Sequence, residues 1–244
     1  SSSNYVGWNR LYCSARSGSS TQSLKLIMKN KLLTVLFLLS FLIAFFPAYF
    51  GYQENLQAIG YGITVIFGLT MIIPLIKSYR WKGVWALLLV GLFGYIIEFI
   101  GVKTCIPYGC FAYSSQMWPQ ILNTIPWLLF FTWTPLIFGV WSIMKNNTNI
   151  KSWYYFVICT GLMALWVDMV LDPLAVHMGL WSFTNNGWWR WIPVTNFMGW
   201  VFSGIVGSAL IVWILGKEKT KQRFDYGLWM ILGFFIGLGI RKVL

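Results

Sequence analysis

Acidic side chains are scarce in this chain of 244 residues, which has six Asp and Glu against 18 Lys and Arg and a single histidine. Charged residues make up 10% of the sequence, hydrophobic residues make up 58%, and the mean hydropathy is +0.66. This composition excludes an ordinary soluble domain and predicts an all-α membrane protein. The net charge of +12 does not indicate nucleic-acid binding, because the basic residues lie between apolar runs rather than on one face.

Sequence motifs of several common enzyme classes are also missing. The chain has no glycine-rich phosphate loop, no GxGxxG nucleotide-binding turn and no HExxH zinc motif. Its four cysteines form no CxxC pair, which disfavours a zinc or iron–sulfur site. Cys105 and Cys110 share one loop and could form a disulfide in an oxidising compartment, although two free thiols are the expectation.

Apolar runs of about 20 residues, the length that crosses a bilayer, predict a bundle of seven transmembrane helices. These runs lie near residues 32–50, 57–76, 84–101, 124–144, 153–171, 194–216 and 225–240. Residues 28–244 are then one multi-pass domain, and the polar, Ser-rich residues 1–27 are expected to be a disordered leader. Two connections, 102–123 and 172–193, are much longer than the others and rich in aromatic residues.

The distribution of Lys and Arg predicts how the bundle is oriented in the membrane. One set of connections carries fourteen basic residues and the other set carries four. The N-terminus is therefore expected to be cytoplasmic in a protein of the cell membrane, with the C-terminus outside. Both long loops then lie on the external side.

Three of the acidic residues, Glu98, Asp168 and Asp172, lie at the ends of apolar runs, on the same side as the long loops. A charged side chain inside a bilayer helix costs about 2.5–3.5 kcal/mol on insertion scales, so these residues indicate a functional site. Asp168 and Asp172 share one helix face, about 6 Å apart along the axis. Two carboxyl groups at this distance do not both ionise easily, and one is expected to hold a proton. Pro173 predicts that this helix ends at Asp172.

Both long loops carry aromatic and polar side chains close to these acids in sequence. Each has a common structural explanation, because Trp often anchors a protein at the membrane surface and a lone histidine is often a hydrogen-bonded surface residue. Their grouping with three acids on one side is what favours a binding site. The candidate substrate-binding residues are Thr104, Tyr108, Tyr113, His177, Trp181, Trp188, Trp191, Asn196 and Trp200.

Two stretches within residues 95–200 resemble the carotenoid biosynthesis family of integral membrane proteins, which includes the carotenoid hydratases. The first stretch reads Glu98-Phe-Ile-Gly101-Val-Lys-Thr104-Cys105-Ile-Pro107-Tyr108-Gly109 and continues to Tyr113. The second reads Asp168-Met-Val-Leu-Asp172-Pro173, followed by Gly179, Trp181, Ile192-Pro193 and Asn196-Phe197-Met198-Gly199-Trp200. The chain departs from the family pattern at Cys105, Tyr108, Phe111 and Phe183.

The resemblance implies an enzyme, a hydro-lyase, that adds water across a terminal C=C bond of an acyclic carotenoid. The candidate residues fit this chemistry, because an acid can protonate the alkene to a tertiary cation, which water then attacks. Asp168 or Asp172 is expected to donate the proton, and Glu98 to act as the base or to position water. Aromatic faces would stabilise the cation. The expected partners are the carotenoid, water and the lipid bilayer, without nucleic acid, a metal or another cofactor.

Two other functions fit fewer of these features. Three carboxylates and His177 could bind a divalent cation, which would act as a Lewis acid in another carotenoid-modifying reaction. Acids inside a membrane also mark the paths of proton-coupled transporters. Transport is disfavoured because the acids lie on one side and the cytoplasmic half of the runs offers no partner to continue a proton relay.

Overall fold

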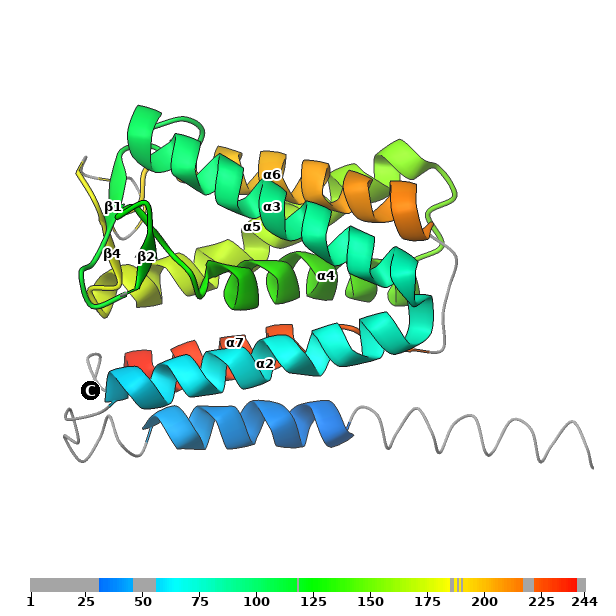
Figure 1. Ribbon diagram of the computed structural model, residues 1–244, viewed down its shortest axis with the longest axis horizontal. Coiled ribbons are helices and arrows are strands. Elements are labelled where there is room, and N and C mark those ends of the chain that lie inside the picture. The colour runs from blue at the N-terminus through cyan, green and yellow to red at the C-terminus, as the bar shows by residue number, and fades with distance from the viewer. Residues whose placement is uncertain are drawn as a thin grey trace, which may run out of the picture.

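Seven helices run roughly along one axis in the computed structural model of the chain (Figure 1). The structure describes residues 31–45, 56–117, 119–184, 187, 189, 191–216 and 222–240, so the expected leader lies outside the described residues. The helices are Lys31–Phe45, α2 (Leu56–Tyr79), α3 (Trp81–Thr104), α4 (Leu129–Asn147), α5 (Trp153–His177), α6 (Val194–Leu215) and α7 (Tyr226–Ile240). This arrangement confirms the predicted all-α class with seven helices.

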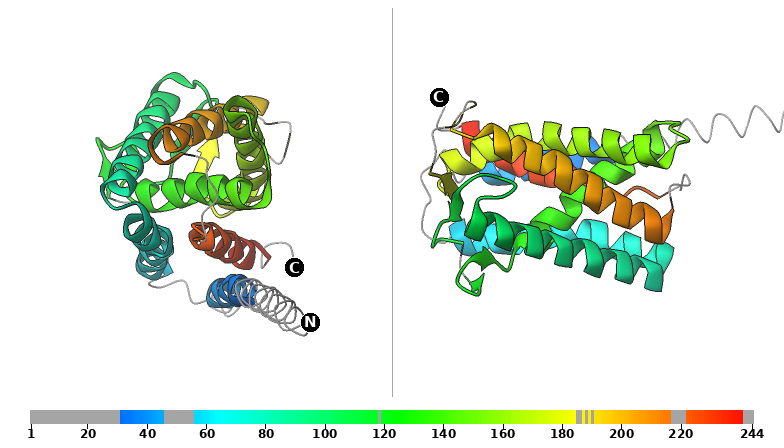
Figure 2. Two further views of the ribbon diagram at one scale, coloured as in Figure 1. Left: turned by 90° about the vertical axis from the view of Figure 1, so that its right-hand side faces the viewer. Right: turned by 90° about the horizontal axis from the view of Figure 1, so that it is seen from above.

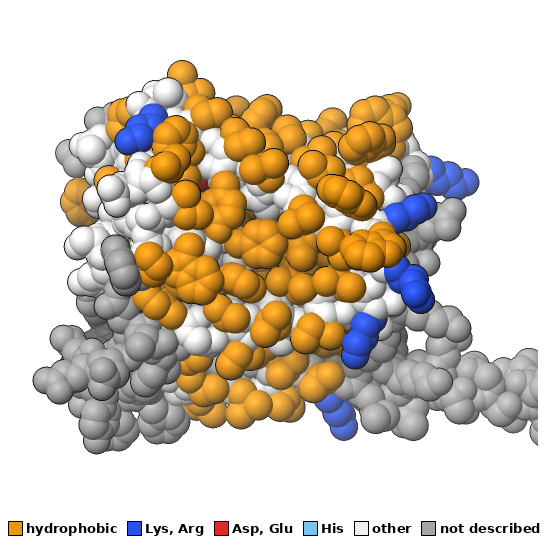
Figure 3. All heavy atoms as spheres, viewed as in Figure 1, with side chains coloured by type: hydrophobic (Ala, Val, Ile, Leu, Met, Phe, Trp, Pro, Cys, Tyr) orange, Lys and Arg blue, Asp and Glu red, His pale blue; other side chains and the backbone are white. Residues whose placement is uncertain are grey.

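The outer surface of the bundle is suited to lipid. Among the described residues, four helices are long and apolar enough to cross a bilayer. Large apolar side chains such as Trp81, Trp166 and Trp213 are more than two-thirds exposed. Figure 3 shows hydrophobic side chains over most of one face, with Lys and Arg gathered mainly at the end opposite the strands. An apolar surface of this extent indicates a membrane protein.

The helices form two groups. Helices α3, α4, α5 and α6 surround one core, and α2, α7 and the helix Lys31–Phe45 form a second layer against it (Figures 1 and 2). Within the first group α5 and α6 pack very closely, because Gly161 of α5 faces Gly204 of α6. A side chain on Gly204 would come within 2.8 Å of the Gly161 backbone. Small residues at this crossing let the two helices carry polar groups within hydrogen-bonding distance.

The two long loops are joined to each other by short antiparallel strands. Strand β1 (Phe111–Tyr113) pairs with β4 (Trp181–Phe183), which sets Tyr113 opposite Trp181. Strands β2 (Gln120–Ile121) and β3 (Ile125–Pro126) form a second pair within the first loop. The strands lie together at one end of the bundle (Figure 1).

Three sequence expectations need correction. Cys105 and Cys110 form a disulfide rather than two free thiols. Helix α4 begins at Leu129 rather than at 124, because Ile125 and Pro126 pair as strand β3.

The third correction concerns the end of α5. This helix does not end at Asp172 but continues through Pro173 to His177. Pro173 lacks only the N–H that would bond the Met169 carbonyl, so neighbouring helical bonds and burial keep the helix intact. The turn after the helix includes Gly179, whose φ of +71° favours glycine.

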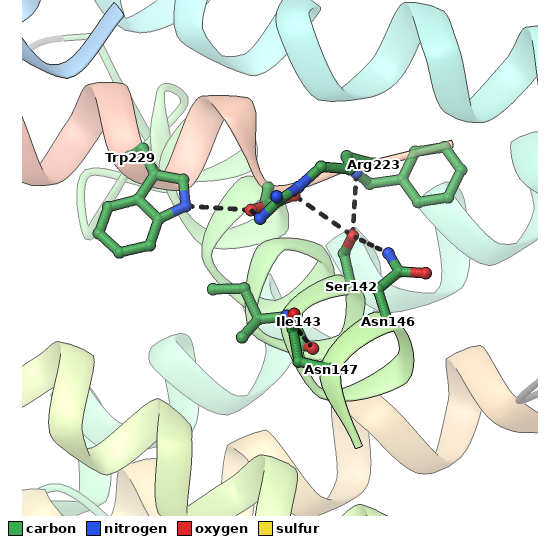
Figure 4. A network of polar contacts seen from close by, with 8 residues as sticks. Ser142, Ile143, Asn146, Asn147, Arg223 and Trp229 are labelled. Carbon is green, nitrogen blue, oxygen red and sulfur yellow. Dashed lines mark hydrogen bonds and ion pairs between the residues drawn. The ribbon is translucent and has the colours of Figure 1, made fainter. Parts of the chain in front are cut away.

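A buried polar network lies at the end of the bundle opposite the strands (Figure 4). Asp225 is fully buried and accepts hydrogen bonds from Arg223 at 2.9 and 2.6 Å and from Trp229 at 3.0 Å. Ser142 of α4 accepts a hydrogen bond from the Phe224 backbone at 3.0 Å. The expectation that this half offers no polar partner is therefore wrong. Because Asp225 is paired with Arg223, the network stabilises the junction of α4 and α7.

Candidate active site

Two helices position an aspartate pair around one amide. Asp168 and Asp172 lie one turn apart on α5, and Asn196 lies in the first turn of α6. The Asn196 Nδ2 donates to Asp168 Oδ2 at 2.9 Å and to Asp172 Oδ2 at 2.5 Å. All three side chains are at most 3% exposed. Within the described part of the chain, Asp168 Oδ1 is buried without a hydrogen-bond partner. A buried carboxyl oxygen without a donor is a strong reason for that group to carry a proton.

The third acid, Glu98, is brought to the same site by α3. It lies two turns before the end of this helix and is 5% exposed. The Tyr113 hydroxyl of β1 donates to Glu98 Oε2 at 3.0 Å. Burial, with the nearby Glu98 as a smaller cause, raises the pKa of Tyr113 well above its usual value. The phenol therefore remains protonated and keeps donating its hydrogen bond to the Glu98 carboxyl group.

Tyr108 lies between α3 and α6. Its ring is 1% exposed, and its hydroxyl shares a hydrogen bond of 2.6 Å with Ser203. Burial raises the pKa of Tyr108 well above its usual value, and the nearby Glu98 is the next largest cause. Glycines make room for the ring, because a Cβ on Gly101 would come within 2.8 Å of Tyr108 Cδ2 and one on Gly199 would overlap it. These two glycines therefore fix where the phenol lies.

A cavity of about 670 Å³ opens beside these groups. Asp172, Glu98 and Asn196 line it together with Tyr108 and Tyr113, whereas Asp168 is not part of its wall. The same end of the cavity is lined by three tryptophans, Trp133, Trp181 and Trp200. Asp172 thus faces the space that a ligand can occupy, and Asp168 supports it from behind.

The aromatic wall of the cavity is built from helices α4 and α6 and from strand β4. The rings of Trp133 and Trp200 lie 6.4 Å apart at an interplanar angle of 30°. Trp181 packs edge-on against Tyr113, with ring centroids 5.9 Å apart. π-faces at this position can stabilise a cation that forms near the acids.

The structure brings five of the nine candidate binding residues to this cavity and leaves the others elsewhere. Tyr108, Tyr113, Trp181, Asn196 and Trp200 line it. Thr104 is exposed and bonds back to the Ile100 carbonyl, His177 lies exposed at the end of α5, and Trp191 is 68% exposed. Trp188 lies outside the described residues.

Two residues of the site were missed by sequence analysis. Trp133 sits inside a continuous apolar run, where nothing distinguishes it from a core residue. Ser203 had a usable signal, because Asn196, Trp200 and Ser203 follow the spacing of one helix face. A hydroxyl on the face that carries the amide points to the same polar site.

The ligand set that a metal ion would need is not assembled among the described residues. No group of three or more His, Cys, Asp and Glu side chains there is close enough to hold an ion. His177, the fourth ligand of the metal-assisted alternative, is exposed and does not line the cavity. The donors that meet at the cavity are carboxyl, phenol, amide and hydroxyl groups.

Comparison with known proteins places this site in a family. The bisanhydrobacterioruberin hydratase of Haloarcula japonica is 31% identical over 167 residues, which cover 65% of this chain and 56% of that protein. The chain therefore aligns with little more than half the length of this relative. No solved structure matches the chain. Residues 59–243, which include every site residue described above, match the family described as carotenoid biosynthesis protein. The chain belongs to this carotenoid biosynthesis family.

Proposed function

We propose that this protein is a carotenoid hydratase, which adds water across a terminal C=C bond of an acyclic carotenoid. The observation that carries the proposal is a single cavity with two kinds of wall. Carboxyl and phenol groups meet at one end, and apolar side chains line the rest. The name of the Haloarcula japonica relative supports the same reaction type. An alkene end group beside a protonated acid, inside an apolar pocket, is the arrangement that hydration requires.

The aspartate pair is the proposed proton donor. Neither aspartate has an ion-pair partner among the described residues, where the salt bridge found is that of Arg223 and Asp225. Two buried carboxyl groups with one amide donor between them are less costly to bury with a shared proton than with two negative charges. Asp172 faces the cavity and delivers the proton, while Asp168 and Asn196 position it and share the remaining charge.

The reaction then proceeds in two chemical steps, and a proton transfer within the site restores the enzyme. The O–H bond of the acid breaks as a C–H bond forms at the less substituted alkene carbon, which leaves a tertiary cation. The faces of Trp133 and Trp200 stabilise this cation. A water oxygen attacks the cation, and Glu98, held by Tyr113, takes the water's proton. Return of that proton to the aspartate pair completes the cycle.

Expression in a host that accumulates lycopene tests the proposal. Extracted pigments should gain the mass of one water for each end that reacts. In D₂O the product should also hold a deuterium on carbon, which a simple exchange of hydroxyl protons does not give. The matched control is the Asp168→Asn, Asp172→Asn double variant, which keeps the shape of the site. Unchanged pigments in cells that contain correctly inserted wild-type protein would overturn hydration of this class of substrate.

A further inference from the structure

The cavity does not end at the acids but continues as an apolar arm into the second layer of helices. The arm is lined by side chains from three helices: Ile43 of Lys31–Phe45, Ile63 of α2, and Ile231, Phe234, Phe235 and Leu238 of α7. The four α7 residues follow the spacing of one helix face. One continuous face of α7 is therefore turned toward the space that begins at the acids.

Close packing at the far end of the bundle explains why this space exists. Near the start of α7, a Cβ on Gly227 would come within 2.6 Å of the Phe67 carbonyl of α2. A Cβ on Gly139 of α4 would come within 2.6 Å of Leu228. The three helices therefore touch there, whereas the cavity lies in the half of the bundle that carries the acids. The arm runs across the helices within that half.

Two hydroxyl groups in the wall of the arm already donate hydrogen bonds within the protein. The Thr64 hydroxyl donates to the Gly60 carbonyl at 2.7 Å, and the Tyr61 hydroxyl donates to the Gln116 carbonyl. Among the described residues that line the cavity, none is Lys or Arg. A phosphate or diphosphate head group would require such a cation or a cluster of free donors. The described lining therefore suits a hydrocarbon chain better than an isoprenoid diphosphate.

The arm also reaches the surface that faces lipid. Ile43 lines the cavity and is 49% exposed, and its helix is the outermost of the second layer (Figure 2). The helix that carries it is held against α7, because a Cβ on Gly237 would contact Ala44 at 3.1 Å. A chain longer than the arm can thus continue past Ile43 into the bilayer.

We propose that the apolar arm binds the polyene chain of the substrate, with the reacting end group at Asp172 and the rest of the chain extending sideways past Ile43 into lipid. This inference rests on the proposed hydration, and it adds the direction from which the substrate is bound. Only one end of a long symmetrical polyene can then occupy the site at a time.

Blocking variants with matched controls test the arm. Ile63→Trp fills the arm, whereas Ile66→Trp adds the same bulk to a side chain of α2 that is 55% exposed and does not line the cavity. Leu238→Trp and Ile236→Trp form a second pair on α7, because Leu238 lines the cavity and the half-buried Ile236 does not. Each protein is purified from a lycopene-producing host, and its bound pigment per protein and its hydrated product are measured.

The two blocking variants should lose bound pigment and product by about tenfold or more, while their controls resemble wild type. Asp172→Asn should keep the pigment but make no product. Wild-type protein that binds pigment without hydrating it would remove the proposed function and leave the arm intact. A folded Ile63→Trp or Leu238→Trp variant that binds and hydrates as wild type does would overturn the arm.

Discussion

Replacement of Asp172 by Asn tests which group delivers the proton. The amide has nearly the same shape as the carboxyl group and can still accept the hydrogen bond that Asn196 donates at 2.5 Å. It has no acidic proton to transfer. General acid catalysis contributes about 10²–10⁴-fold to a rate. We therefore expect turnover to fall at least about a hundredfold, which corresponds to about 3 kcal/mol of activation free energy.

Asp168→Asn is the comparison that the structure makes informative. Asp168 accepts from the same amide at 2.9 Å but does not line the cavity. Its replacement changes one hydrogen bond to the carboxyl pair, which shares one negative charge, and such a bond is worth about 1.5–3 kcal/mol. Turnover should fall roughly tenfold to a hundredfold, less than for Asp172→Asn. Both variants should insert and fold, because a neutral amide is easier to bury than a carboxylate.

The assay compares initial rates of hydrated product in membranes from a lycopene-producing host, with each variant quantified in the same membranes. The expected order is wild type, then Asp168→Asn, then Asp172→Asn. If both variants hydrate the carotenoid at nearly the wild-type rate, the aspartate pair is not the donor and Glu98 becomes the candidate. The reverse order of the two variants would move the donor role to Asp168.

Three further predictions concern packing, the distant polar network and topology. Gly199→Ala should lower the stability in detergent by about 1–3 kcal/mol, since the new methyl group overlaps the Tyr108 ring. Asp225→Asn should also destabilise the protein, by about 1.5–3 kcal/mol, because it removes the charge to which Arg223 donates. A reporter fused after Leu244 should behave as external and one inserted near Asn147 as cytoplasmic, as the distribution of basic residues predicts.

Each of these predictions has a control or a contradicting result. Gly62→Ala should leave stability nearly unchanged, because a Cβ there has no atom within 4 Å. If Gly199→Ala matches this control in its thermal unfolding midpoint, Tyr108 is not held as described. For Asp225→Asn, hydration by the folded variant should persist, and its selective loss would give the network a catalytic role. Reversed behaviour of both reporters would overturn the orientation.

The helices could be predicted from sequence because the length of an apolar run is set by the thickness of the bilayer. Their ends could not, and the reasons lie in tertiary structure. Pro173 looked like a helix end, but burial of α5 keeps the helix intact around one missing hydrogen bond. Residues 124–126 were expected to begin a helix, but Ile125 and Pro126 pair with strand β2 instead. Tertiary contacts, which cannot be seen in the sequence, override local preferences for helix boundaries.

The acids of the site were predictable for an energetic reason. A carboxyl group is costly in a membrane helix, so Glu98, Asp168 and Asp172 were conspicuous, and the structure places all three at one site. Aromatic side chains have no comparable cost in a membrane helix. The sequence therefore did not distinguish Trp191, which was predicted to bind substrate, from Trp133, which was not predicted. One is 68% exposed and the other lines the cavity.

The disulfide and the strand pairing explain why residues from two distant stretches form one site. The Cys105–Cys110 disulfide closes the turn that carries Tyr108, and β1 then leads directly to Tyr113. Pairing of β1 with β4 sets Trp181 against Tyr113, whose hydroxyl holds Glu98. A change in the strand pairing would therefore separate Trp181 from Tyr113 and move the Tyr113 hydroxyl relative to Glu98. Disulfides persist in oxidising compartments, so the Cys105–Cys110 disulfide favours an external position for its loop. The pairing of β1 with β4 then favours the same side for the other long loop.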